Sequence, residues 1–122
     1  MRVSFDYLPE FERRAKLLAK KYKSFKNDYL SFLDELEKNP FGGESLGHHT
    51  YKARMAIASK GKGKRGGARV ITYNLVQESE SEVLVILMSI YDKNEINNVS
   101  DSYLRSLIQE IEVIHGSRSQ TP

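Results

Sequence analysis

Basic side chains at alternating positions of a predicted strand carry the clearest chemical signal in this sequence. Lys52 and Arg54 are separated by one residue, so on a strand they would share a face and lie about 7 Å apart. That separation is close to the spacing of successive phosphates along a nucleic-acid strand. Arg69 opens the next predicted strand and Lys93 follows the last one, so strand pairing would gather four cations on one surface. A solvated strand face is the alternative explanation.

These cations belong to a basic segment that sets the charge of the whole chain. From Ser45 to Gln77 there is no Asp or Glu, and there are seven Lys or Arg residues. The whole chain has 19 Lys and Arg residues and 16 Asp and Glu residues, so acidic residues are in excess outside this segment. Clustered positive charge concentrates the electrostatic potential, which favours a polyanionic partner such as nucleic acid.

A glycine-lysine loop, residues 59–68, forms the centre of the basic segment. Glycine lets backbone N–H groups approach a phosphate closely, and neighbouring lysines add positive charge. The loop lacks the G-x-x-x-x-G-K-[ST] pattern of a P-loop, because Gly66 is followed by glycine and alanine. A flexible hairpin tip and a polybasic localisation signal are the alternatives, and with so little apolar surface the loop is predicted to be mobile. Its candidate RNA-binding side chains are Lys60, Lys62, Lys64 and Arg65.

Two strand tyrosines extend the basic surface. Tyr73 and Tyr91 lie on the predicted strands near residues 69–76 and 82–91, where a tyrosine can stack on a base or donate a hydrogen bond to a phosphate. A half-buried strand tyrosine without a ligand is the alternative.

Other catalytic and metal-binding patterns are weak. His48 and His49 are adjacent, but no third ligand lies nearby in the sequence, so we predict no metal site. The spacing indicates neither a Ser-His-Asp arrangement nor paired carboxylates. The chain has no cysteine, which excludes disulfides and thiolate metal sites. We therefore expect neither a metal nor another cofactor.

The rest of the sequence predicts the elements that would position these side chains. Apolar residues at helical spacing predict two helices between Pro9 and Asn39, with Ser24 as a cap of the second. Ser100 is a suitable cap for a last helix. Alternating or continuous apolar residues predict four strands, near residues 3–7, 51–57, 69–76 and 82–91.

The predicted order is β-α-α-β-β-β-α. It indicates an α+β domain in which a helical hairpin packs on a mostly antiparallel four-stranded sheet. Strand 82–91 is apolar on both faces at its centre, which favours a middle position in the sheet. Helices on one face would leave the other open to a ligand. The 122-residue chain is expected to form one domain, residues 1–115, followed by a flexible tail, residues 116–122.

The sequence also bears on location. No apolar run approaches the roughly 20 residues that cross a bilayer. The first residues lack the apolar region of a secretory signal. We therefore expect no membrane segment and a cytoplasmic location, with which the absence of cysteine agrees.

Three segments carry a family resemblance: Tyr51–Arg54, Ser59–Tyr73 with the letters SKGKGKRGGARVITY, and Ser89–Glu95 with the letters SIYDKNE. They resemble the RelE/ParE toxin superfamily, and within it the HigB-like branch. The resemblance extends over most of the chain. It implies a RelE/ParE-like fold and a toxin of a type II toxin-antitoxin module, which a cognate antitoxin protein binds. Many members cut mRNA in the ribosomal A site, others poison DNA gyrase, and some have no established target.

The resemblance also implies roles for individual residues. Tyr91 and Tyr103 match an aromatic or hydroxyl group beside the scissile phosphate, both less closely than the cations match theirs. The segment Ser89–Glu95 contains no histidine, where some relatives have an acid-base histidine, so the general acid and base stay open. Four cations match those that hold the phosphate and stabilise its transition state: Lys52, Arg54, Arg69 and Lys93.

The implied reaction is metal-independent RNA cleavage. The 2′-OH of the substrate is the nucleophile, so the protein has to orient it, neutralise the phosphorane and protonate the leaving 5′ oxygen. The glycine-lysine loop would contact ribosomal RNA through its phosphates. The sequence therefore predicts a ribosome-dependent mRNA endoribonuclease, an mRNA interferase that inhibits translation. The alternatives are a non-catalytic toxin acting on DNA gyrase or another protein, and an inactive RNA-binding relative.

Overall fold

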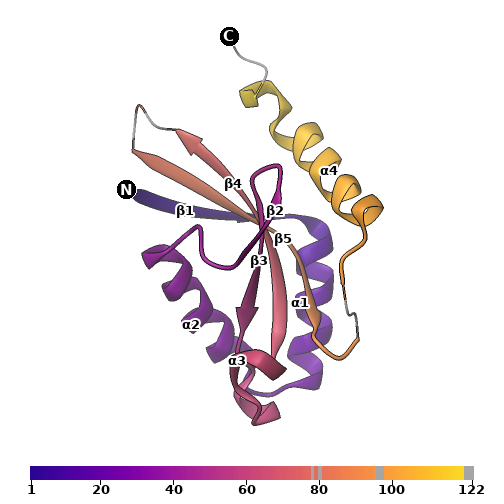
Figure 1. The fold of residues 1–122 in the computed structure, drawn as a ribbon. Coiled ribbons are helices and arrows are strands. Elements are labelled where there is room, and N and C mark those ends of the chain that lie inside the picture. Colours follow the sequence, from indigo (N-terminus) through magenta and orange to yellow (C-terminus); the bar gives the residue numbers. More distant parts are fainter. Residues whose placement is uncertain (78, 80, 96–97, 120–122) are drawn as a thin grey trace.

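The computed structural model describes residues 1–77, 79, 81–95 and 98–119, and shows an α+β fold built on one mixed sheet (Figure 1). The strands are β1 (Arg2–Tyr7), β2 (Glu44–Gly47), β3 (Thr50–Met55), β4 (Ala68–Gln77) and β5 (Glu82–Asp92). They lie in the order β1-β5-β4-β3-β2, so β5 has the inner position that its sequence predicts. β1 is parallel to β5, and the other neighbouring pairs are antiparallel. The sheet has five strands where the sequence predicted four.

The additional strand is β2, a four-residue edge strand whose side chains are mostly exposed. It lacks the alternation that identifies a half-buried strand, so its sequence gave no strand signal. It pairs with β3 across a two-residue turn, His48 and His49. Both histidines have positive φ, 52° and 64°, which is the backbone geometry of a type I′ hairpin turn. The histidine pair thus forms the turn that adds the fifth strand.

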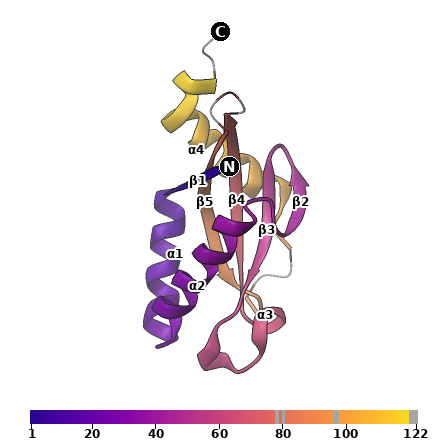
Figure 2. The ribbon, with the colours of Figure 1, turned by 90° about the vertical axis from the view of Figure 1, so that its left-hand side faces the viewer.

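The helical hairpin covers one face of the sheet (Figure 2). It consists of α1 (Pro9–Lys21) and α2 (Phe25–Lys38), and Pro9 lies in the first turn of α1, where it needs no N–H donor. The apolar residues of both helices pack on the same side of β3, β4 and β5 in a single core. The residues that they bury most completely are Phe11, Leu18, Phe25, Phe32 and Leu36.

The last helix, α4 (Asp101–Ser119), packs on the opposite face. Ser100 caps it as predicted, since its Oγ accepts a hydrogen bond of 3.1 Å from the Tyr103 N–H. The second core joins α4 to β4 and β5, so helices cover part of both faces rather than one. On this second face, α4 does not cover Lys52 and Arg54 of β3. Residues 120–122 of the predicted tail lie outside the described residues.

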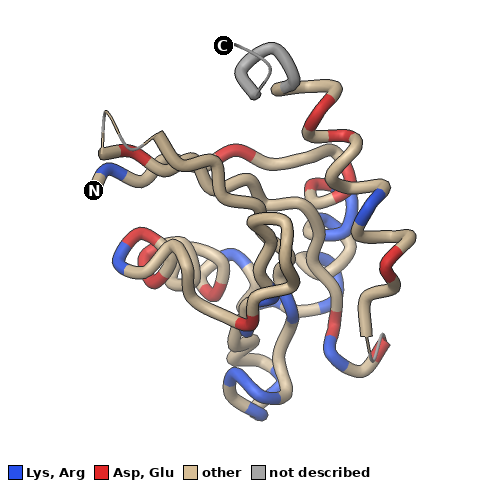
Figure 3. The backbone as a smooth tube through the Cα atoms, turned by 45° about the horizontal axis from the view of Figure 1, so that its top comes forward, with Lys and Arg blue, Asp and Glu red and all other residues tan. Residues whose placement is uncertain are grey.

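The loop between β3 and β4 is partly helical, whereas the sequence predicted a mobile hairpin tip. It contains the 3₁₀ turn η1 (Ala58–Lys60) and the single turn α3 (Gly63–Gly66). Polar contacts fix its first part: the Ser59 N–H donates to Ser24 Oγ at 2.9 Å, and the Ala58 N–H donates to Asp28 Oδ2 at 3.0 Å. The prediction of a mobile loop considered only apolar side chains, whereas hydrogen bonds anchor this loop. Basic residues gather around the loop (Figure 3).

Candidate functional site

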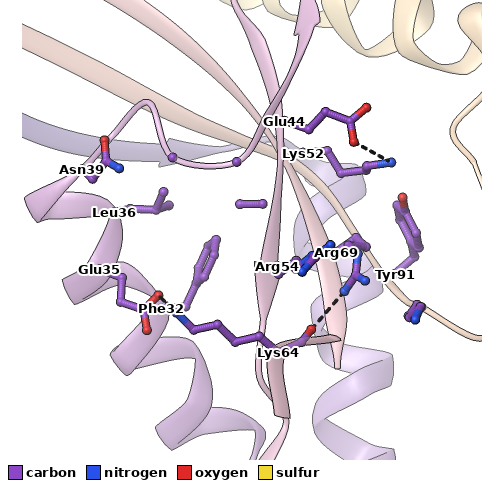
Figure 4. Close-up of a pocket in the computed structure, with 14 residues that line it drawn as sticks. Phe32, Glu35, Leu36, Asn39, Glu44, Lys52, Arg54, Lys64, Arg69 and Tyr91 are labelled. Atoms are coloured by element: carbon purple, nitrogen blue, oxygen red, sulfur yellow. Dashed lines mark hydrogen bonds and ion pairs between the residues drawn. The ribbon is translucent and has the colours of Figure 1, made fainter. Parts of the chain in front are cut away.

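A pocket of about 610 Å³ lies at the outer edge of β3 (Figure 4). Ala53 and Arg54 are consecutive on β3, so their side chains point to opposite faces of the sheet. Both line the pocket, which therefore continues around the sheet edge from one face to the other. Its lining comprises Phe32, Glu35, Leu36, Asn39, Gly42, Gly43, Glu44, Lys52, Ala53, Arg54, Lys64, Arg69, Tyr91 and Lys93.

Strand register gathers the predicted catalytic residues in this pocket. Arg54 of β3 is opposite Arg69 of β4, and Arg69 is opposite Tyr91 of β5. Lys52 lies two residues from Arg54 on the same face, and Lys93 follows β5 directly. All five residues therefore line one cavity. Alternation and strand pairing predicted a common surface for the four cations among them.

Arg54 and Lys52 are the cations that β3 offers to a ligand. Arg54 is exposed, and no carboxylate among the described residues forms an ion pair with it. Lys52 Nζ lies 3.6 Å from Glu44 Oε1, whose side chain is 67% exposed. Because Glu44 is solvated and the contact is long, it contributes little, so Lys52, whose side chain is 18% exposed, can exchange it for a phosphate.

Arg69 is buried, and its guanidinium is held by the backbone. Nη1 donates to the carbonyls of Lys64 and Ala68 at 3.1 and 3.2 Å, and Nη2 donates to that of Arg65 at 3.0 Å. Burial lowers the pKa of Arg69, and the positive charge of Arg54 lowers it further. Arg69 therefore links the α3 turn to the sheet while adding positive potential beside Arg54. An anion near both guanidinium groups would relieve their repulsion.

Tyr91 supplies a hydroxyl group without a partner. The residue is 2% exposed, and within the described part of the chain its OH makes no hydrogen bond. A buried hydroxyl of this kind is unusual, because buried polar groups are nearly always bonded. Burial raises the pKa of Tyr91, and the charge of Arg69 opposes this only in part. At neutral pH the group is protonated and can donate a hydrogen bond to a ligand.

The side chains of the glycine-lysine loop have separate surroundings. Lys64 lines the pocket, and its Nζ donates to Glu35 Oε2 at 2.8 Å, which connects the loop to α2. Lys62 and Arg65 are exposed outside the pocket lining. The loop thus presents cations both within the cavity and beside it.

Lys60 differs from its neighbours, because its side chain is only 6% exposed. Its Nζ donates to Asp92 Oδ1 at 2.7 Å, and the Tyr22 hydroxyl donates to the other oxygen, Oδ2, at 2.5 Å. Burial by itself would raise the pKa of Asp92, but the hydrogen bonds from Lys60, Tyr22 and the Asn94 N–H outweigh it and lower the pKa to about 2. The ammonium group of Lys60 is engaged in this cluster, away from the pocket.

Two further tyrosines from the sequence analysis lie outside the pocket. Tyr73 packs in the core beneath α4, with its ring 6.0 Å from that of His49. The Tyr103 hydroxyl donates to Glu10 Oε2 at 2.7 Å and lies 2.7 Å from Ser89 Oγ. Burial raises the pKa of each of these tyrosines. Both hold α4 in place and do not reach the cations.

Sequence analysis missed the wall that α2 gives to the pocket. Phe32 and Leu36 have the spacing of an ordinary buried helix face, and Glu35 and Asn39 are single exposed polar residues. No local pattern marks them as a site. Only the packing of α2 beside β3 places them opposite the cations.

The described residues contain no group of three or more His, Asp or Glu side chains placed to hold a metal ion. In the same part of the chain no helix has the length and apolar character needed to cross a bilayer. A comparison of the chain with protein-family models found no matching family.

Proposed function

We propose that this protein is a RelE/ParE-like toxin of a type II toxin-antitoxin module that cleaves mRNA on the ribosome without a metal ion. One observation carries the proposal: Lys52, Arg54, Arg69 and Lys93 line a single pocket together with the unpartnered hydroxyl of Tyr91. Cations of this kind neutralise phosphate, and a free hydroxyl donor can bind one of its oxygens. The helical hairpin and the loop between β3 and β4 agree with the RelE/ParE-like topology that the sequence resemblance implies.

In the proposed reaction the substrate supplies its own nucleophile. The 2′ oxygen loses its proton and attacks the adjacent phosphorus, the bond from phosphorus to the 5′ oxygen breaks, and that oxygen leaves with a proton. The products are a 2′,3′-cyclic phosphate and a 5′-hydroxyl end. Arg54 is the best placed to bind the phosphorane, since its guanidinium is exposed and can donate twice to phosphate.

The other residues have supporting roles in this scheme. Arg69 adds positive charge from a fixed position, because three hydrogen bonds to carbonyl groups hold its guanidinium. Protonated Tyr91 donates to the phosphate, and Lys93 or Lys52 transfers a proton to the leaving 5′ oxygen. Lys60 is engaged with Asp92, so we leave it out of the proposed RNA contact.

The proposal includes partners and a location. The exposed side chains of Lys62 and Arg65 extend the positive surface from the pocket toward ribosomal RNA. An antitoxin segment that is acidic or amphipathic would complement the same surface and block it. Because the proposed substrate is mRNA bound to the ribosome, the proposed site of action is the cytoplasm.

The test compares Arg54→Ala with the parent protein after induction in cells that lack an antitoxin. We expect the parent to arrest growth and to create new 5′-hydroxyl ends in mRNA. Loss of a transition-state charge contact typically costs about 100-fold or more in rate, so Arg54→Ala should relieve the arrest and remove these ends. Arg105→Ala is the matched control, since Arg105 is an exposed arginine on α4 outside the pocket.

Other outcomes separate the alternatives. Growth arrest without new mRNA ends would favour a non-catalytic toxin acting on gyrase or another protein. Growth without arrest would favour an inactive relative. An Arg54→Ala variant that is folded and still cleaves mRNA would show that the pocket is not the active site.

A further inference from the structure

The pocket has two chemically different halves on either side of β3. The strand cations Lys52, Arg54 and Arg69 lie with Tyr91 on the face toward α4. Phe32, Leu36 and Ala53 form an apolar floor on the face toward α2, where the Lys64 ammonium group meets Glu35 (Figure 4). The three apolar residues are only 3–5% exposed and line the pocket, so they form its bottom. A ligand that fills the whole pocket needs an anionic group and, next to it, an apolar surface.

The open edge of β3 separates the two halves. The register between β2 and β3 ends where Glu44 meets Lys52, so the described strands leave the following residues of β3 without a partner on that side. Gly43 passes so close to this edge that a side chain there would meet the Lys52 carbonyl at 2.6 Å. Glycine at this position therefore lets the chain pack directly against the backbone of β3.

Polar groups surround the apolar floor. The Glu35 carboxylate is held by Lys64 at 2.8 Å, and the Asn39 side chain is exposed at the end of α2. Both line the pocket. A carboxylate accepts hydrogen bonds from the amino and imino edges of bases, and an amide can donate and accept. The volume of about 610 Å³ is within the range of small-molecule sites, about 300–1,000 Å³.

We infer that the α2 half of the pocket is a nucleobase subsite, in which Phe32, Leu36 and Ala53 contact the face of the base next to the phosphate bound by Arg54. This inference rests on the proposed function, because it assigns the anionic half to a nucleotide phosphate. A nucleotide joins a phosphate and a flat, largely apolar ring in one molecule. An acidic peptide fits less well, because in this half its carboxylates would meet that of Glu35.

The test uses the whole protein and two small probes, adenosine 3′-monophosphate and ribose 5-phosphate. Contact between a base and apolar or aromatic side chains typically strengthens binding about tenfold or more, so we expect the nucleotide to bind at least about tenfold more tightly. In methyl-resolved NMR spectra, the Leu36 and Ala53 signals should shift with the nucleotide only. Leu33, on α2 but outside the pocket lining, is the matched control signal.

Arg54→Ala separates the subsite from the proposed function. We expect this variant to bind both probes more weakly by a similar factor, because each probe loses the same phosphate contact. Arg105→Ala should bind both probes as tightly as the parent does. If both probes bind the parent equally and leave Leu36 and Ala53 unshifted, the base subsite is wrong while the phosphate site stands. If neither probe binds, the subsite and the phosphate pocket behind the proposed function both fail. If hexaglutamate shifts these two signals and the nucleotide does not, the floor receives a protein segment and the inference is overturned.

Discussion

Two lysines of the glycine-lysine loop, Lys60 and Lys62, show how strongly position controls the role of a residue. They are separated by one glycine and look equivalent in the sequence. Lys60 is buried and donates to Asp92, whose side chain is 2% exposed, whereas Lys62 is exposed. Removing one partner of a buried ion pair leaves the other charge uncompensated, which costs far more than the loss of a solvated charge. Lys60 therefore anchors the loop, and Lys62 remains available to a ligand.

We expect Lys60→Met to lower the free energy of unfolding by about 2 kcal/mol or more, because buried Asp92 would keep only the more distant ammonium group of Lys21, 3.8 Å from its Oδ2. Lys62→Met should change it by less than about 0.5 kcal/mol. Urea denaturation of both variants and the parent measures the difference. Equal stability of the three proteins would show that the pair between Lys60 and Asp92 does not hold the loop.

The same pair predicts how stability depends on pH. The folded-state pKa of Asp92 is about 2, below the ordinary value of 3.8, so its stabilisation is complete above about pH 4. That stabilisation, about 2 kcal/mol, is lost as the pH falls through the folded-state pKa. Lys60→Met removes a hydrogen bond that lowers this pKa, so its acid unfolding should begin at a higher pH than that of the parent. Circular dichroism between pH 7 and pH 2 provides the measurement.

At the scale of elements, the turn between β2 and β3 decides whether the fifth strand forms. His48 and His49 both have positive φ, a conformation in which side chains with a Cβ are strained. Asparagine tolerates this conformation better than most residues, and β-branched residues tolerate it least. β2 supplies Glu44 and the approach of Gly43 to β3, so a stable turn also shapes the rim of the pocket.

We expect His48→Asn to keep or raise the thermal unfolding temperature. His48→Val should lower stability by about 1–2 kcal/mol, because valine is strained at positive φ. His48 is exposed, so the two changes differ mainly in their backbone preference. Differential scanning calorimetry compares them. Equal stability of the two variants would argue against this turn geometry.

At the scale of the whole molecule, the charge distribution and the two-sided packing act together. The basic segment supplies β3, the loop and β4, and its seven cations lie between Lys52 and Arg69. Figure 3 shows basic residues gathered around the loop between these strands. α1 and α2 cover one face of the sheet, and α4 covers part of the other. The part of the second face that α4 leaves uncovered carries Lys52 and Arg54. A polyanion is therefore attracted to one region of the surface.

This electrostatic arrangement predicts the salt dependence of RNA binding. For a short single-stranded RNA with a 2′-deoxy cleavage position, affinity should fall linearly with salt concentration on logarithmic axes. We expect Arg54→Ala to reduce the slope by about 0.7, the value for one phosphate contact on a single strand. Lys20 is an exposed residue of α1, so Lys20→Ala should leave the slope unchanged. Fluorescence anisotropy at several salt concentrations gives the slopes, and equal slopes for Arg54→Ala and the parent would exclude this contact.

Local patterns in the sequence determined the α+β class, the positions of seven elements and the side chains that share a strand face. Alternation put Lys52 and Arg54 on one side of β3, and the apolar centre of β5 gave its inner position. These properties depend on neighbours in the chain, which a sequence displays directly.

Tertiary structure alone decided how distant residues meet. β2 forms because a turn at His48 holds it against β3, and α2 forms a wall of the pocket because its buried face packs beside the same strand. Lys60 and Asp92 are far apart in the sequence, and only the packing of the loop against the end of β5 turns one candidate RNA contact into an anchor. Each of these pairings depends on which surfaces the chain buries together, a choice that the whole fold makes at once and no single segment encodes.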